Sequence, residues 1–503
     1  MTAADAYSEL VRYAKDVSLL QSCGAVLGWD QQTYMPPAGA DLRGDQLALL
    51  ARLTHERATA PRLGELLAAC EATGFEPGSI EAANVRELRH GYDRAVKLPA
   101  RLVEELAQVT TAAQQAWQVA RSADDFPAFR PHLDAVMRLK REEADAVGWT
   151  GHRYDALLDE YEPGCTAAEL TPLFAGLTAE LAPLVKAVGE SGKSPAYVLT
   201  RDFPVDRQKL FAESAAAALG FDFAAGRLDT TAHPFCSAFG PGDCRLTTRY
   251  NPRQFGEAFF GVLHEAGHGL YEQGLRPAHF GTPCGSYCSL GVHESQSRLW
   301  ENQVGRERPF WRHFFPRLKQ AFPAATAGVT LDQWDAAVNA VRPSLIRVEA
   351  DEATYNLHVA LRFELELALL DGSLAVADLP GAWAEKVRTY LGLAVPTDRE
   401  GCLQDIHWSF GGVGYFPTYT LGNLLAAQLM RAANAEVGAD NLSAAFATGD
   451  FAPLLDWLRT HVHAHGRRFR AGELCRRATG ADLSPEPFLT GLREKLSRLY
   501  GVC

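Results

Sequence analysis

Long segments with an apolar residue at every third or fourth position constrain the fold of this 503-residue chain more than any other feature. The run from Leu98 to Ser122, LPARLVEELAQVTTAAQQAWQVARS, is typical, and later segments repeat its pattern. This spacing places apolar side chains on one face of an α-helix, which the fold must then bury. Proline and glycine stand mainly between these segments, where helices begin and end. We therefore predict a mainly α-helical fold.

One stretch, from Phe221 to Tyr250, departs from the helical pattern. It reads FDFAAGRLDTTAHPFCSAFGPGDCRLTTRY and is rich in β-branched and aromatic residues, with GPGD as an interruption. This composition predicts a short strand, a turn and a second strand. Such a small β-ribbon would stand immediately before the histidine-bearing segment described below. A free strand edge at that place can bind an extended peptide through main-chain hydrogen bonds.

The chain gives no sign of separate domains. It contains no low-complexity tract, no long linker and no internal repeat. A chain of this length buries a large core. We therefore expect one helical domain over residues 1–503. This domain could consist of two lobes around a cleft.

The charge and the cysteine content exclude several classes of function. Lys and Arg total 49 and Asp and Glu total 61, so the formal net charge of −12 argues against nucleic acid or an anionic membrane as the main partner. The N-terminal sequence shows no export signal, and no 18-residue apolar stretch is present. The ten cysteines are spread out, and neither the Cys236/Cys244 pair nor the Cys284/Cys288 pair has a second pair to complete a metal site. We expect a cytoplasmic protein with reduced thiols.

The sequence HEAGH, from His264 to His268, is the best candidate for a site that carries out chemistry. On a helix, two histidines four residues apart lie on one face and can bind one metal ion. Glu265 would then lie close enough to accept a hydrogen bond from a water on that metal. Two histidines on a helix face are also common as ordinary core or surface residues, so the motif requires a third ligand.

The third ligand must come from outside HEAGH. Metzincins place glycine three and histidine six residues after the second histidine, where this chain has Tyr271 and Gly274, so that class is excluded. The other common solution is a glutamate from a following helix, which leaves a fourth position for water. The segment GVHESQSRLWENQVG has helical character, and its Glu294 is the best candidate, with Glu301 as the alternative. Glu272, on the histidine helix itself, is expected to face elsewhere.

A second histidine-rich sequence, HVHAHG, contains His461, His463 and His465. The first and third could share a helix face, but no glutamate follows either histidine as in HEAGH, and arginines surround the segment. We interpret it as a solvated helix end rather than a metal site.

Five sequence elements follow one another along the chain in a recognisable order. They are WDQQTYMP (29–36), DCRLT (243–247), HEAGH followed by HESQS (293–297), IRVEAD (346–351) and GCLQDIHW (401–408). In this order they resemble the landmarks of the carboxypeptidase Taq family of metallocarboxypeptidases, and the resemblance covers essentially the whole chain.

The resemblance implies a helical fold of the neurolysin and angiotensin-converting-enzyme type, with a deep central groove. It implies zinc bound by His264, His268 and Glu294, with Glu265 as the catalytic carboxylate. Members of the family are typically homodimers that remove C-terminal residues with broad preference, and cobalt or another divalent metal serves in some of them. We therefore expect a zinc-dependent carboxypeptidase that acts on peptides with a free C-terminal carboxylate.

Peptide hydrolysis also needs hydrogen-bond donors that face the developing oxyanion. The sequence HWSFGGVGYFPTYTLG offers His407, Tyr415 and Tyr419 for this role. The alternative for each of them is ordinary core packing. For His407 the resemblance places the surrounding motif at the active site.

An exopeptidase must recognise a free carboxylate, for which the planar fork of arginine is suited. Arg347 is our candidate for this carboxylate clamp. Arg245, on the β-ribbon, is expected to restrict the length of the substrate, with an ion pair to an acid such as Asp243 as the alternative. Asp351 and Glu352 are candidates for orienting the metal-bound histidines.

Two other functions are compatible with these residues. An oligopeptidase of the same fold would cut peptides internally, and would accept C-terminally amidated peptides that a carboxylate-reading enzyme handles poorly. A non-catalytic helical scaffold would keep zinc for structure only, but it would have no need for the carboxylate of Glu265.

Overall fold

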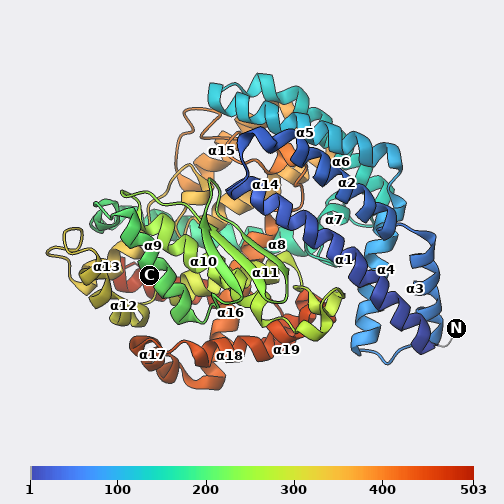
Figure 1. The fold of residues 1–503 in the computed structure, drawn as a ribbon. Coiled ribbons are helices and arrows are strands. Elements are labelled where there is room, and N and C mark those ends of the chain that lie inside the picture. The colour runs from blue at the N-terminus through green and yellow to red at the C-terminus, as the bar shows by residue number, and fades with distance from the viewer. Residues whose placement is uncertain (1–2, 503) are drawn as a thin grey trace. The chain divides into compact units, whose positions relative to one another are not determined.

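A computed structural model describes residues 3–502 as a mainly α-helical protein with one small β-sheet (Figure 1), which confirms the predicted fold class. The chain divides into two compact units, each assembled from three separate stretches of sequence. Unit 1 contains the described residues up to Val96, Ala196–Val338 and Leu425–Leu483. Unit 2 contains Lys97–Pro195, Asn339–Leu424 and the residues from Ser484 onward. A single domain with a central groove stays a prediction.

Unit 1 contains the sheet and the HEAGH sequence. Its helices are α1 (Ala3–Thr33), α2 (Ala40–Ala58), α3 (Pro61–Thr73), α4 (Ile80–Lys97), α9 (Val205–Leu219), α10 (Phe255–Gly274), α11 (Leu290–Arg298), α12 (Arg308–Ala321), α13 (Leu331–Val338), α17 (Ala439–Thr448), α18 (Ala452–His461) and α19 (Ala471–Thr479). A π-helical turn, Leu299–Val304, continues α11 directly.

In the described part of unit 2, all regular elements are helices. Its helices are α5 (Ala100–Ala123), α6 (Phe126–Val147), α7 (Arg153–Leu158), α8 (Ala167–Glu190), α14 (Tyr355–Asp371), α15 (Leu379–Leu391) and α20 (Glu486–Tyr500), and α16 (Pro417–Ala433) begins in unit 2 and ends in unit 1. The sequence signals at helix ends act as expected: Thr166 and Glu169 form a capping box at the start of α8, and Gly372 and Gly392 end α14 and α15 in the left-handed conformation.

The sheet consists of β1 (Gly226–Thr230), β2 (Cys236–Gly240) and β3 (Asp243–Thr248), in the order β1-β3-β2. The predicted turn GPGD joins β2 to β3, which run antiparallel, with Ala238 opposite Cys244. The prediction of only two strands was wrong, because β1 also pairs with β3, in parallel and with Leu228 opposite Leu246. Parallel strands are not joined by a tight turn, so no hairpin signal in the sequence marks this pairing.

The sheet packs against α10 (Figure 1), and its strand β2 also contacts α1. Gly269 of α10 lies so close to β3 that an added Cβ would stand 2.9 Å from Leu246 Cδ2. From α1, the Ser22 hydroxyl donates to the Phe239 carbonyl of β2 over 2.5 Å. Near the end of α1, the Tyr34 hydroxyl donates to the Asp229 carboxylate of β1.

Aromatic side chains fix the far side of α10 in the core of unit 1. Phe255 and Phe259 stack one turn apart with ring centroids 5.2 Å apart. Phe255 contacts Trp334 of α13, and Phe259 contacts Trp311 of α12, at 5.5 and 5.4 Å. Each such pair adds about 0.5–1.5 kcal/mol beyond the burial of apolar area. The apolar sequence before HEAGH therefore holds the histidine helix in place.

A glycine inside HEAGH lets α10 and α11 approach each other at backbone distance. An added Cβ on Gly267 would stand 2.5 Å from the Gln296 carbonyl oxygen and 2.6 Å from Ser297 Cα. Backbone atoms cannot move aside as the end of a flexible side chain can. The helix with the histidines and the helix with Glu294 therefore meet only because residue 267 has no side chain.

Among residues 3–502, no helix combines the length and the apolar character that crossing a bilayer requires.

We predict that Gly267→Ala lowers the free energy of unfolding by about 1–3 kcal/mol, because the new methyl group overpacks the α10–α11 contact. The same change should weaken metal binding, since it pushes Glu294 away from the histidines. Gly261→Ala is the matched control on the same helix, because its Cβ would meet only Thr248 Oγ1, at 3.9 Å. That control should leave stability unchanged or raise it by up to about 1 kcal/mol. Equal urea midpoints for the two variants would contradict the prediction.

Candidate metal centre and arginine cluster

Three side chains of unit 1 converge on one point. Their donor atoms, one each from His264, His268 and Glu294, all lie within 4.8 Å of one another. Glu294 Oε2 is 3.5 Å from Nε2 of His264 and 3.5 Å from Nε2 of His268. Donors held about 2.0–2.2 Å from a tetrahedral zinc stand about 3.4 Å apart, so this set fits such an ion. The structure thus brings together the three residues predicted as metal ligands.

Helix geometry produces this convergence. His264 and His268 lie one turn apart on α10, so their rings share a face. Ser289 caps the start of α11: its hydroxyl accepts a hydrogen bond from the Val292 amide, and this places Glu294 in the second turn.

Arg298 fixes the orientation of the Glu294 carboxylate. Its Nε donates to Glu294 Oε1 over 2.7 Å, which leaves Oε2 to face the histidines. The Ser297 hydroxyl also donates to Oε2, over 2.9 Å. Burial would raise the pKa of Glu294, but the charges of Arg298 and of the histidines hold that pKa well below its usual value. Glu294 is therefore an ionised, buried carboxylate.

The other ring nitrogen of His264 meets Glu301, in the π-helical turn that follows α11. His264 Nδ1 and Glu301 Oε2 are 3.0 Å apart. Arg298 Nη1 and Arg306 Nη2 each lie 3.1 Å from the Glu301 carboxylate. Glu301, considered in the sequence as an alternative ligand, is instead the residue that orients His264.

The other ring nitrogen of His268 meets a second histidine. His268 Nδ1 and His293 Nδ1 are 2.5 Å apart, and His293 Nε2 is 2.8 Å from Glu272 Oε1. Glu272 was expected to face away from the histidines, but it lies on the same side of α10 as His268 and pairs with His293, the residue that orients His268. A spacing of four residues from His268 to Glu272 on one helix is the sequence signal for their shared face.

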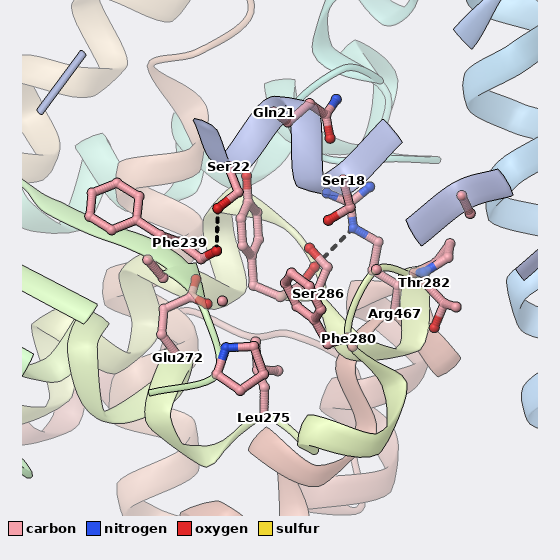
Figure 2. Close-up of a pocket in the computed structure, with 18 of the residues that line it drawn as sticks. Ser18, Gln21, Ser22, Phe239, Glu272, Leu275, Phe280, Thr282, Ser286 and Arg467 are labelled. Atoms are coloured by element: carbon pink, nitrogen blue, oxygen red, sulfur yellow. Dashed lines mark hydrogen bonds between the residues drawn. The ribbon is translucent and has the colours of Figure 1, made fainter. Parts of the chain in front are cut away.

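Glu272 also lies on the wall of a cavity in unit 1 of about 820 Å³. Figure 2 shows Glu272 at one side of this cavity, with Ser18, Gln21 and Ser22 of α1 opposite. Arg467 also lines this cavity and donates from Nε to the Tyr287 carbonyl over 2.9 Å. The residues that orient His268 are therefore within reach of a space large enough for a small ligand.

Glu265 lies between the two histidines in sequence and is only 6% exposed. Burial raises the pKa of its carboxyl to about 7, against the lowering effect of His264. A carboxylate with a pKa near neutrality is suited to accept and return a proton.

Glu301 and His293 take the second ring nitrogens of His264 and His268, the role for which the sequence offered Asp351 and Glu352 as candidates. Asp351 instead accepts backbone N–H groups, among them that of Arg342 at 2.8 Å, and Glu352 pairs with Lys495 at 2.7 Å.

The HVHAHG segment is not a solvated helix end at its centre. His463 is fully buried, and its Nε2 lies 2.9 Å from Gln296 Oε1. Among the residues that the structure describes, the only group with metal-binding spacing is the one on α10 and α11.

In unit 2, Arg347 lies in a buried cluster. Its Nε and Nη2 donate to Asp405 Oδ1 over 3.0 and 2.9 Å, and its Nη1 donates to the Tyr355 hydroxyl over 2.8 Å. The guanidinium also stacks over the Tyr419 ring at 4.7 Å. Asp405 in turn binds Arg362 of α14, at 2.7 Å from Oδ2 to Nε. The sequence reasoning missed Asp405 and Arg362, although Asp405 lies within the GCLQDIHW sequence.

The three candidates for oxyanion donors in unit 2 lie together. His407 Nε2 is 3.1 Å from the Tyr419 hydroxyl, and the Tyr415 ring lies 5.2 Å from the His407 ring. Burial and the charge of Arg347 lower the pKa of His407 to about 3, so the imidazole is neutral. Tyr419 contacts Arg347 directly, and His407 lies close enough to feel the charge of Arg347.

Arg245, on β3 in unit 1, forms the ion pair that the sequence offered as its alternative role. Its Nε and Nη2 each lie 2.8 Å from an oxygen of Asp243. The guanidinium is sandwiched between Trp29 at 4.4 Å and Phe239 at 4.9 Å. These contacts hold Arg245 rigidly against α1.

Comparison with known proteins agrees with this geometry. The model of the carboxypeptidase Taq (M32) metallopeptidase family matches residues 9–496. Thermostable carboxypeptidase 1 of Thermus thermophilus is 50% identical over 513 residues, which covers 100% of both chains. Carboxypeptidase 1 of Bacillus subtilis is 37% identical over 488 residues, which covers 97% of each chain. The crystal structure of an M32 carboxypeptidase from Deinococcus radiodurans R1 matches with a TM-score of 0.95 and 43% identity, over 99% of this chain and 100% of that one.

We predict that His293→Ala weakens divalent-metal binding by about 10- to 100-fold, because His268 loses the partner that fixes its ring. Competition with a chromogenic chelator measures the affinity. His233→Ala is the matched control, since His233 is exposed and lies in the β1–β2 connection. Equal affinities in the His293 variant and the unchanged protein would show that His268 is oriented by other contacts.

Proposed function

Since the chain belongs to the carboxypeptidase Taq (M32) family of metallopeptidases, and is thus a metallocarboxypeptidase, we propose that it removes C-terminal residues from peptides with the help of one zinc ion. His264, His268 and Glu294 would hold the ion, and cobalt or another divalent metal is the alternative occupant. The observation that carries the proposal is the convergence of these three donors beside Glu265.

Zinc with three protein ligands keeps a fourth position for water, lowers the pKa of that water and polarises a carbonyl group. Glu265 is proposed to accept the proton of the attacking water and to return it to the leaving amine. Its burial supports this role, because a raised pKa makes the carboxylate a better proton acceptor near neutral pH. Glu301 and His293 would keep the two histidine rings turned toward the ion.

Arg347 is proposed to bind the C-terminal carboxylate of the substrate. An arginine has five N–H donors, and three of those of Arg347 are used by Asp405 and Tyr355. Two donors remain for an incoming carboxylate, and the stacking on Tyr419 limits how the guanidinium can turn. An internally cutting oligopeptidase of the same fold is the alternative, and would need no such clamp.

His407, Tyr415 and Tyr419 are proposed as donors to the developing oxyanion, with core packing as the alternative for each. The pair formed by His407 and Tyr419 supports a shared role, because a neutral imidazole can orient the phenol hydroxyl. One such donor contributes about 3 kcal/mol to the stabilisation of a transition state.

Arg245 and β2 are proposed to act on the rest of the peptide. The ion pair and the two aromatic contacts of Arg245 make it a rigid obstacle that can restrict substrate length. The Thr247 amide donates to the Phe235 carbonyl, and pairs alternate along an antiparallel ladder, so Ser237 faces Arg245 of β3 while the N–H and C=O groups of Cys236 and Ala238 point away from β3. These groups can pair with an extended peptide.

Broad preference for the residue removed, a homodimeric state, a cytoplasmic location and the absence of nucleic-acid or membrane partners also belong to this proposal. The family resemblance supports the first two, and the net charge of −12 supports the last.

We expect Glu265→Gln to lower kcat for release of a C-terminal amino acid by about 100- to 10,000-fold, because the amide cannot accept the proton of the attacking water. Bound metal, measured by atomic absorption, should stay the same. Glu257→Gln, in the first turn of the same helix, is the control and should keep full activity. Chelation should abolish activity in the unchanged protein, and added zinc should restore it. Full activity in Glu265→Gln would exclude the proposed mechanism.

We expect Arg347→Ala to raise KM for a peptide with a free C-terminus by about 10- to 100-fold, the cost of a lost charge-assisted hydrogen bond. Hydrolysis of the same peptide as its C-terminal amide should change little. Arg388→Ala, on the exposed surface of α15, is the control for loss of a positive charge. An equal loss on both peptides would remove Arg347 from the carboxylate role and favour the oligopeptidase alternative.

A further inference from the structure

The carboxylate of Asp405 is shared between two arginines. Its Oδ1 accepts from Arg347, at 3.0 Å from Nε and 2.9 Å from Nη2. Its Oδ2 accepts from Arg362 Nε over 2.7 Å, and Arg362 Nη2 lies 2.6 Å from the same oxygen. Among the described residues, Asp405 is the only carboxylate paired with either arginine. The cluster therefore contains two guanidinium groups and one carboxylate.

The two arginines differ in what remains of their hydrogen-bonding capacity. Arg362 is fully buried and donates from Nη1 to the His358 carbonyl and from Nη2 to Gln404 Oε1, at 2.6 and 2.7 Å. It also lies over the Trp383 ring at 4.5 Å. Together with its contacts to Asp405, these hydrogen bonds use four of its five N–H donors. Arg347 is 4% exposed and keeps two N–H donors without a partner among the described residues.

The charges around the cluster do not cancel. Asp405 stays ionised, because the two arginines outweigh the effect of burial and hold its pKa well below the usual range. Burial lowers the pKa of Arg362 to about 10, which leaves it charged at neutral pH. The nearby histidines add nothing, since burial lowers the pKa of both His358 and His407 to about 3. The cluster holds one positive charge in excess.

An isolated Arg347–Asp405 pair would be neutral and would attract a carboxylate only weakly. Arg362 changes this, because it takes one oxygen of Asp405 and supplies the charge that balances it. A buried positive charge without a counter-charge is costly, and an anion from outside removes that cost. The arrangement favours one monovalent carboxylate at the two free donors of Arg347.

We propose that Arg362 is a positioning residue for substrate recognition. By pairing with Asp405, it keeps Arg347 oriented and leaves the positive charge of Arg347 available to the C-terminal carboxylate of the peptide. This inference rests on the clamp role proposed for Arg347. It extends that role to a residue that the substrate never touches.

The test compares a neutral and a charged replacement of Arg362. Arg362→Gln removes the charge but can still donate to the His358 carbonyl, whereas Arg362→Lys keeps the charge. The measurement is the ratio of kcat/KM for a peptide with a free C-terminus to kcat/KM for its amide. Arg362→Gln should lower this ratio by about ten-fold or more, through KM rather than kcat, and Arg362→Lys should stay within about three-fold of the unchanged enzyme.

A second variant also removes the excess positive charge of the cluster, but through a change at another residue. Gln404 Oε1 accepts from Arg362 Nη2 and, over 2.9 Å, from the Arg347 amide. Gln404→Glu keeps both arginines and adds a negative charge between them, so it should lower the ratio as Arg362→Gln does. Gln115→Glu, exposed on α5, is the matched control for net charge and should leave the ratio unchanged. Thermal unfolding identifies the folded variants whose kinetics are compared.

The outcomes separate this inference from the function on which it rests. An unchanged ratio in Arg347→Ala would overturn the clamp itself. A lowered ratio in Arg347→Ala with an unchanged ratio in Arg362→Gln and Gln404→Glu would overturn the role of Arg362 alone. Equal losses in Arg362→Gln and Arg362→Lys would show that Arg362 acts through packing and not through its charge.

Discussion

The contact between the backbones of α10 and α11 at Gly267 is the constraint on which the metal centre depends. A histidine pair on one helix presents only two donor atoms to a metal ion. The third donor must come from another element, which has to lie at a fixed distance from the pair and at the same level along the helix. Gly267 faces the carbonyl of Gln296, two residues after Glu294, so the closest approach of the two helices occurs beside the converging donors. The aromatic core behind Phe255 and Phe259 presses α10 toward that contact from the opposite side.

The two clusters of polar residues handle buried charge in opposite ways. In unit 1, Glu294 and Glu301 pair with Arg298 and Arg306, and Glu265 adds a third carboxylate near them, so that its ionisation puts negative charge in excess and favours a cation. In unit 2, two guanidinium groups share the single carboxylate of Asp405, so positive charge is in excess. Each cluster has an imbalance of the sign that its proposed ligand corrects. In unit 1 the supporting contacts take Nδ1 of both histidines and Oε1 of Glu294, and in unit 2 they take three of the five N–H donors of Arg347.

The sequence was sufficient for those features that depend on local spacing. The four-residue interval in HEAGH and the helical segment around Glu294 predicted the three donors, and apolar periodicity predicted the helical fold. Partners that come from distant positions could not be found in this way. The pairing of Arg347 with Asp405 spans 58 residues of sequence, and that of His264 with Glu301 spans 37. Strand β1 was missed for the same reason, because its partner β3 is not its neighbour along the chain.

Helix α1 has a consequence for the solubility of the folded chain. In a three-stranded sheet ordered β1-β3-β2, both outer strands have an unpaired edge, and unpaired edges recruit strands from other molecules. Ser22 of α1 donates to the Phe239 carbonyl of β2, and Tyr34, the residue after α1, donates to the Asp229 side chain of β1, so α1 and the residue that follows it lie against both outer strands. The first helix of the chain therefore serves as a guard against edge-to-edge association, and a protease that removed it would turn a catalytic scaffold into a template for aggregation.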